Sequence, residues 1–252
     1  MGTALLLLGG VSAVVLMQTD VAGIPGRLPD SSLRLLMTGA LFAGSGLLVT
    51  LSWLGRRSGA HLNPAVTLAF RLTGQLHNHD LAGYVVAQFL GAAVGAGAAR
   101  LLWGGHAVVV HVATTVPGPG VSDVRAVLTE AGMTALLIAV ILGCVMFRPL
   151  VHWTPFAVWV TVTVLVWQGA PITGTSLNPA RSAGSAVASL DGAHLAVDFV
   201  GPLAGAAVVA AVARLLGARR RVLTARLFHD PRHPTSFRSR LPVRGRGLEP
   251  AA

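Results

Sequence analysis

Six long apolar stretches, separated by short polar segments, run along this chain of 252 residues. Five lie near residues 33–54, 81–103, 126–147, 152–170 and 194–217, and each approaches or exceeds the roughly 20 residues that cross a hydrocarbon core about 30 Å thick. The sixth, from Met1 to Met17, lacks the basic segment and cleavage pattern of a signal peptide, so we interpret it as a membrane helix. Because it is short for a span, we expect it to start upstream of Met1. The pattern predicts an all-α membrane protein with six transmembrane helices.

Two segments between these stretches share a sequence motif. Residues 59–65 and 174–180 agree at five of seven positions, and each ends in Asn-Pro-Ala: Asn63, Pro64 and Ala65 in the first copy, Asn178, Pro179 and Ala180 in the second. Asn is a favoured N-cap and Pro is tolerated at the first helical position, so each copy is predicted to start a helix. The apolar runs that follow are too short to cross the membrane, which favours re-entrant half-helices at residues 63–72 and 178–190.

The order of these elements indicates a duplication. Each half has three spans, an odd number, so the second half must be inverted relative to the first. We therefore expect inverted repeats at residues 1–110 and 111–217. The irregular backbone before each half-helix survives at membrane depth only where it is buried in protein or lines water, so it is predicted to line a pore.

Composition agrees with a membrane protein and places the charge at one end. The chain is 53% hydrophobic and 11% charged, with a formal net charge of +10. Residues 218–252 contribute +7 of it, from nine Arg against Asp230 and Glu249, so the excess indicates a tail rather than a nucleic-acid-binding surface. Its lack of apolar periodicity predicts a largely disordered segment, and its charge favours a cytoplasmic position near anionic lipid.

Counting back from that tail through six spans places both termini in the cytoplasm. A chain without Lys and rich in Ala, Gly and Arg is typical of a high-GC bacterial genome, which predicts the cell (inner) membrane. The single Cys144 excludes a disulfide within the chain. No metal-ligand cluster, phosphate loop or nucleophile motif occurs, so an enzyme is not expected, and no cofactor or metal is predicted.

The motifs resemble those of the aquaporin (major intrinsic protein) family of water and small-solute channels. The resemblance rests on three segments: Ser58-Gly59-Ala60-His61-Leu62-Asn63-Pro64-Ala65-Val66-Thr67, Leu177-Asn178-Pro179-Ala180-Arg181-Ser182 and Val200-Gly201-Pro202. The resemblance covers residues 1 to about 217. It implies a passive homotetrameric channel with one pore per subunit, in which half-helix dipoles and an Arg exclude ions and protons. Water, glycerol, urea and neutral metalloid acids are the candidate solutes, and a secondary transporter or a closed structural protein are the alternatives.

The resemblance also locates the pore residues. Asn63 and Asn178 would cap their half-helices and donate from their amide groups to a solute. The selectivity filter would comprise Ala43, Val166, Thr175 and Arg181, with Val66 opposite Arg181 in the first repeat. His61 is expected to line the inner vestibule or simply to pack there, and Glu130 is expected to accept hydrogen bonds from the loop before Asn178.

The expected filter is wider than that of strict water channels. Ala43 and Val166 replace an aromatic residue and a histidine, although Phe42 would restore the aromatic if the helix carried a one-residue bulge. Ser182 and Ala186, in contrast, are of the type found in water channels. The pair Asp198-Phe199 matches neither the water channels nor the glycerol facilitators of the family. Thr175 stands where many water channels carry the cysteine at which mercury blocks them. The choice among solutes stays open.

Overall fold

The chain forms a bundle of helices. The computed structural model describes residues 1–232 and 239–241. Its helical elements are α1 (Gly2–Gln18), η1 (Asp20–Ala22), α2 (Ile24–Arg27), α3 (Ser31–Leu51), α4 (Trp53–Ser58), α5 (Pro64–Leu72), α6 (Asn78–Trp103), α7 (Gly105–Val109), η2 (His111–Ala113), α8 (Asp123–Met146), η3 (Val151–Trp153), α9 (Thr154–Thr173), α10 (Pro179–Ser189), α11 (Leu195–Leu215) and α12 (Ala218–Arg221). The described residues contain no strand beyond one isolated bridge between Thr224 and Ser239.

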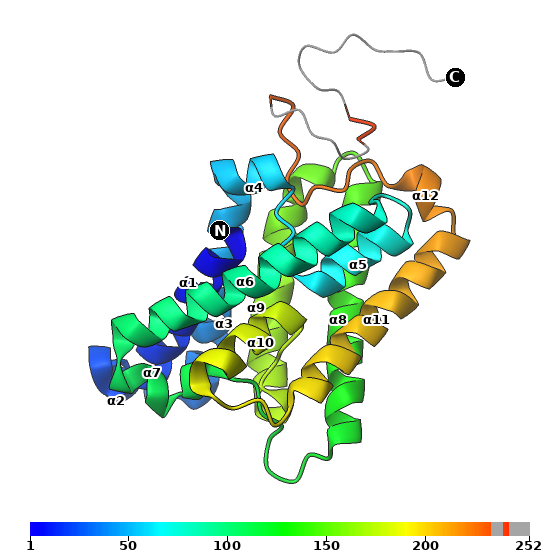
Figure 1. Ribbon diagram of the computed structural model, residues 1–252. Helices are drawn as coiled ribbons and strands as arrows, with labels where there is room; N and C mark the ends of the chain where they lie inside the picture. The colour runs from blue at the N-terminus through cyan, green and yellow to red at the C-terminus, as the bar shows by residue number, and fades with distance from the viewer. Residues whose placement is uncertain (233–238, 242–252) are drawn as a thin grey trace.

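The six predicted spans correspond to α1, α3, α6, α8, α9 and α11 (Figure 1). Five of these helices are long and apolar enough to cross a membrane, and the sixth, α1, has 17 residues. Large apolar side chains such as Leu48, Leu101 and Leu215 lie exposed on their outer faces, where lipid would cover them. The fold is therefore the predicted all-α membrane architecture.

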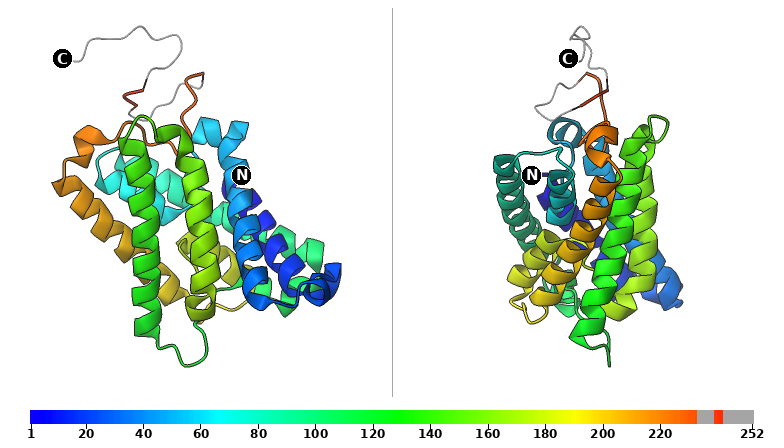
Figure 2. Two further views of the ribbon diagram at one scale, coloured as in Figure 1. Left: turned by 180° about the vertical axis from the view of Figure 1, so that it is seen from behind. Right: turned by 90° about the vertical axis from the view of Figure 1, so that its right-hand side faces the viewer.

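Two short helices, α5 and α10, lie between the long ones. Figure 1 and the side view in Figure 2 place α5 nearer the end of the bundle that carries the chain after α12, and α10 nearer the opposite end. Each begins at the Pro of an Asn-Pro-Ala motif, and each ends within one residue of its predicted boundary. We call the first end the tail side and the other the loop side, after the loop of residues 110–121.

Small residues bring the helices close at equivalent places in the two halves. A Cβ atom on Gly95 of α6 would lie 2.2 Å from the Ala4 carbonyl oxygen of α1. A Cβ atom on Gly205 of α11 would lie 2.1 Å from the Ala131 carbonyl oxygen of α8. Neither distance can accommodate a side chain, so both close helix contacts require glycine.

Part of the Arg-rich tail is folded, which corrects the expectation of a largely disordered segment. Between residues 222 and 230, small and apolar side chains such as Val222, Ala225 and Leu227 are buried against the tail side of the bundle. Composition alone missed this because the apolar residues of the segment follow no helical or strand periodicity and gain their partners only from the surface beneath them. The rest of the predicted disordered tail, residues 233–238 and 242–252, lies outside the described residues.

Candidate functional site

A cavity of about 270 Å³ lies between the long helices, and both Asn-Pro-Ala loops contribute to its wall. The two loops meet there, and the predicted pore positions come together from four helices and from the loops that precede α5 and α10. The residues that line the cavity and that the sequence predicts for the pore are Ala43, Asn63, Val66, Val166, Thr175, Asn178 and Arg181.

The two motif asparagines bind each other's loops. The Asn63 side-chain oxygen accepts from Ala65 N at 2.8 Å, and that of Asn178 accepts from Ala180 N and Arg181 N at 3.1 and 3.3 Å. Each amide nitrogen donates across the junction, Asn63 Nδ2 to Leu177 O at 2.8 Å and Asn178 Nδ2 to Leu62 O at 2.9 Å. The caps are those predicted, but one N–H of each amide is committed to the opposite loop. One N–H per asparagine is left for a solute.

Both loops reverse direction with the same backbone conformation. Gly59 and Gly174 have φ values of 76° and 77°, and the next residues, Ala60 and Thr175, have φ values of 60° and 56°. Residues other than glycine pay roughly 1 kcal/mol or more for this left-handed region. Such strain persists only where the surroundings determine it, which here are the hydrogen bonds between the two loops and those that the second loop donates to Glu130.

Glu130 of α8 holds the second loop. Its carboxylate is fully buried and accepts from Thr173 Oγ1 at 2.6 Å, Ser176 N at 2.8 Å and Leu177 N at 2.9 Å. A buried carboxylate needs such donors, and the loop's buried N–H groups need an acceptor. The side chain therefore fixes the backbone that carries Leu177 and Asn178 to the cavity.

Arg181 reaches the cavity from the first turn of α10. Its Nη1 donates to the Ala113 carbonyl at 2.7 Å, and its Cζ lies 5.2 Å from the centroid of the Phe42 ring. Within the described residues the guanidinium has no ion-pair partner. The guanidinium is therefore held by a carbonyl and a ring face rather than by a close ion pair, and it places a positive charge at the cavity wall.

The other three predicted filter residues surround the same region. Ala43 and Val166 face the cavity from α3 and α9, and Thr175 lies in the second loop, where its hydroxyl donates to Leu165 O at 3.3 Å. Helix α3 is regular from Ser31 to Leu51, so no bulge exchanges Phe42 for Ala43. Both residues line the cavity, Ala43 as a small wall position and Phe42 as the ring beneath Arg181.

A buried polar chain on the loop side was not predicted from the sequence. Thr115 donates to Asp198 of α11, the Thr115 and Ser182 hydroxyls lie 3.0 Å apart, and those of Ser182 and Ser176 lie 2.7 Å apart. This series of hydrogen bonds connects the loop of residues 110–121, whose Ala113 carbonyl holds Arg181, with α10 and α11. The available signal was Asp198 itself, since a carboxylate in an apolar span marks a polar network.

His61 does not take its predicted place in the vestibule. It is absent from the cavity lining and packs between Phe70 and Tyr84, with ring centroids 5.1 and 5.0 Å away. Its Nε2 donates to the Ala225 carbonyl of the tail at 2.7 Å. The packing alternative therefore describes His61 better, because the folded tail supplies the acceptor that the sequence could not place.

No group of three His, Cys, Asp or Glu side chains in the described part of the chain is arranged to hold a metal ion. The polar groups of the residues that line the cavity are amides, hydroxyls, backbone groups, the Trp159 indole and the Arg181 guanidinium. These groups can donate hydrogen bonds to, or accept them from, a small polar molecule in the cavity.

Comparisons with known proteins agree with this geometry. The chain matches the family described as "Major intrinsic protein" over residues 1–213. It is 38% identical to aquaporin NIP1-1 of Zea mays over 168 residues, which cover 66% of this chain and 58% of the maize protein. It is 40% identical to a probable aquaporin AqpM of Archaeoglobus fulgidus over 164 residues, which cover 62% of this chain and 67% of that protein.

A solved structure shares the fold. The X-ray structure of the aquaglyceroporin from Plasmodium falciparum superposes with a TM-score of 0.68 at 24% identity, covering 84% of this chain and 91% of the other. The family match over most of the chain, with two Asn-capped half-helices that meet at one cavity, leads to a single assignment: this chain belongs to the major intrinsic protein family.

Proposed function

We propose that the protein is a passive membrane channel for water and small neutral solutes. The observation that carries the proposal is the junction of α5 and α10, where Asn63 and Asn178 exchange hydrogen bonds beside a cavity that also contains Arg181. The two helix starts aim their positive dipole ends at this junction. A solute there meets amide donors but no carboxylate.

Ion exclusion follows from the same charges. Cations approach two helix N-termini and the Arg181 guanidinium, which is the kind of barrier by which aquaporin-type pores are known to exclude protons and cations. The one remaining N–H of each asparagine can donate to a water oxygen at the junction. A water held by two donors points its hydrogens away from them, which interrupts a chain of proton transfers.

The filter would admit solutes larger than water. Ala43, Val166 and Thr175 add no large ring to the cavity wall, whose aromatic side chains are Phe42 and Trp159. We propose that Ala43, Val166, Thr175 and Arg181 form the selectivity filter, that Val66 lines the opposite half, and that glycerol, urea or neutral metalloid acids pass with water. The apolar wall with few donors favours small uncharged polyols and amides.

The proposal also covers the internal repeats, the oligomeric state and the membrane location of the protein. The equivalent glycine contacts of α6 and α11 support two inverted repeats, at residues 1–110 and 111–217. We propose a homotetramer in the cell membrane of a bacterium, with both termini in the cytoplasm. The tail side would then face the cytoplasm and the loop side the exterior.

A secondary transporter is the alternative that uses similar architecture. Glycerol uptake into proteoliposomes, measured with and without imposed proton and sodium gradients, separates the two. We expect the rate of glycerol uptake to exceed that of protein-free vesicles and to be the same with and without either gradient. Uptake that follows either gradient would contradict a passive channel.

Mercury gives a further prediction. Thr175 offers no thiol at the filter, and Cys144, the single cysteine, is only partly buried on α8 and does not line the cavity. We therefore expect Hg(II) to leave the water permeability of the Cys144→Ser variant unchanged, measured by stopped-flow light scattering. Block that persists in this variant would show that another group at the pore binds mercury.

A further inference from the structure

Residues 222–230, which we call the cap segment, lie across the tail side of the bundle (Figures 1 and 2). Leu223 N donates to Val145 O at 3.0 Å at one end, and Leu227 N donates to Gly59 O at 3.1 Å further along. Between them, the Ala225 carbonyl accepts from His61 at 2.7 Å. The cap segment is thus bonded to the loop that leads into the first Asn-Pro-Ala motif.

One side chain of the cap segment belongs to the cavity wall. Leu227 lines the cavity together with Ala60 and Leu62, and only 7% of its surface is exposed. At the loop side the same cavity is bordered by Thr114 and Gly174. A solute that crosses the cavity toward the tail side therefore meets an apolar side chain from outside the transmembrane helices. Apolar constrictions of this kind gate pores by excluding water.

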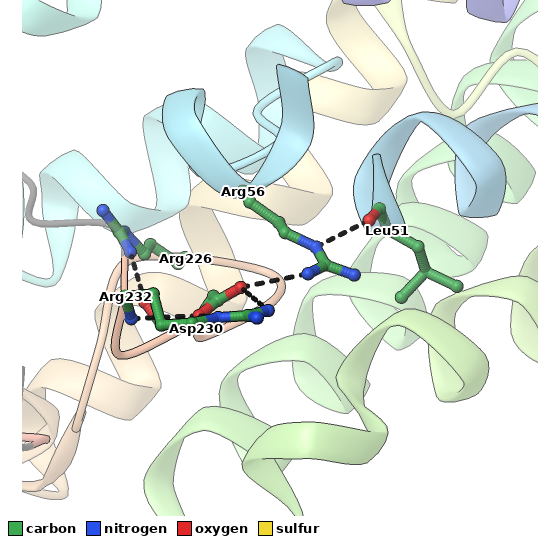
Figure 3. A network of polar contacts seen from close by, with 5 residues as sticks. All are labelled: Leu51, Arg56, Arg226, Asp230 and Arg232. Carbon is green, nitrogen blue, oxygen red and sulfur yellow. Dashed lines mark hydrogen bonds and ion pairs between the residues drawn. The ribbon is translucent and has the colours of Figure 1, made fainter. Parts of the chain in front are cut away.

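A charged clasp closes the end of the cap segment (Figure 3). Asp230 is buried and receives Arg56 Nη1 at 3.0 Å and both Arg232 Nε and Nη2 at 3.1 and 2.9 Å. Arg56 in turn donates from Nε to Leu51 O at 2.8 Å, which anchors the clasp to the end of α3. In Figure 3 the side chains of Arg56 from α4 and of Arg232 from the tail converge on Asp230, with Arg226 nearby.

The clasp remains charged at neutral pH. The hydrogen bonds from Arg232 hold the pKa of the Asp230 carboxyl well below its usual range. Arg226, also buried, extends Nη1 to the Asp230 backbone carbonyl at 3.4 Å. Charge-assisted hydrogen bonds of this kind are stronger than neutral ones. Because those from Arg56 and Arg232 all end on the Asp230 carboxylate, a single substitution of Asp230 removes the acceptor charge from all of them.

We propose that the cap segment is a gate: Leu227 restricts flow through the tail-side mouth of the cavity, and the Asp230 clasp holds the segment in place. The inference rests on the proposed channel function, because it concerns the same cavity. It adds a part of the chain outside the family match, which ends at residue 213.

The size of residue 227 tests the gate. Water and glycerol permeabilities of proteoliposomes are compared for wild type, Leu227→Ala and Leu227→Trp, with Leu216→Trp as the control at an exposed position. We expect Leu227→Ala to raise both permeabilities about threefold or more and Leu227→Trp to lower them, because the side chain sets the apolar constriction. Equal permeabilities in all four folded proteins would overturn the proposal.

Release of the clasp tests the second part. Asp230→Asn is made alongside Asp20→Asn, the same change at an exposed acid far from the tail. Detachment of the cap segment is monitored by the rate at which maleimide labels Cys at position 227, in the Leu227→Cys variant that also carries Cys144→Ser. We expect Asp230→Asn to raise both labelling and permeability, and Asp20→Asn to raise neither. Faster labelling without faster flow would overturn the gate, and unchanged labelling would overturn the role of the clasp.

The outcomes also separate this proposal from the channel function. If every protein, including wild type, gives the permeability of protein-free vesicles, the channel function fails and the gate fails with it. If wild type exceeds protein-free vesicles but the Leu227 series does not vary, only the gate fails.

Discussion

Glu130→Leu is expected to abolish solute permeation and to destabilise the protein strongly. The substitution removes the acceptor of Thr173 Oγ1, Ser176 N and Leu177 N, all buried. Each orphaned donor costs about 1–3 kcal/mol, so the loss is about 3 kcal/mol or more. That is a large share of the roughly 5–15 kcal/mol that stabilises a folded domain. The melting temperature in detergent and the water permeability of proteoliposomes measure the effect.

Two variants make this prediction specific. Glu130→Gln keeps one carbonyl oxygen, so it should retain part of the stability but misplace the loop at Leu177. Thr134→Val lies one turn further along α8, and its hydroxyl has no hydrogen-bond partner among the described residues, so it should resemble wild type. A Glu130→Leu protein with normal melting and normal permeability would show that the loop does not depend on the carboxylate.

Ala43→Phe is expected to lower glycerol and urea permeability by about tenfold or more, which corresponds to a barrier raised by about 1.4 kcal/mol. The added ring would enter the cavity that Phe42, Val166 and Arg181 also line, and it would narrow the space beside them. Water, being smaller, should lose less. Stopped-flow light scattering of proteoliposomes with each solute gives the permeability ratio.

Leu41→Phe provides the matched control, because Leu41 lies two residues away on α3 and is exposed on the outer face. The same ring there should leave the ratio of glycerol to water permeability unchanged. Should Ala43→Phe also leave the ratio at its wild-type value, Ala43 would not belong to the filter.

The sequence predicted the helices and the two half-helices well because their signals are local. Apolar runs define the spans, and the Asn-Pro pair caps and starts α5 and α10 within one residue of the prediction. Arg181 follows Asn178 by three residues, within the same first turn of α10, so its position at the cavity comes with the start of that helix. These features depend on neighbours within one helical turn.

What the sequence missed depends on segments that meet only in the folded chain. The Asn63 and Asn178 amides bind carbonyls 114 and 116 residues away, so the commitment of one N–H each could not be read from either motif. The packing of Leu227 and the bond from His61 to Ala225 likewise need the surface of the bundle. The Arg-rich composition of the tail did not indicate those contacts.

In the proposed channel, one cavity passes neutral solutes and excludes ions. Proteoliposomes loaded with a pH-sensitive dye allow osmotic shrinkage and proton entry to be recorded on the same preparation. We expect shrinkage faster than in protein-free vesicles, with weak temperature dependence, while proton entry stays at the protein-free rate. Shrinkage no faster than in protein-free vesicles, or proton entry that rises together with water flow, would contradict it.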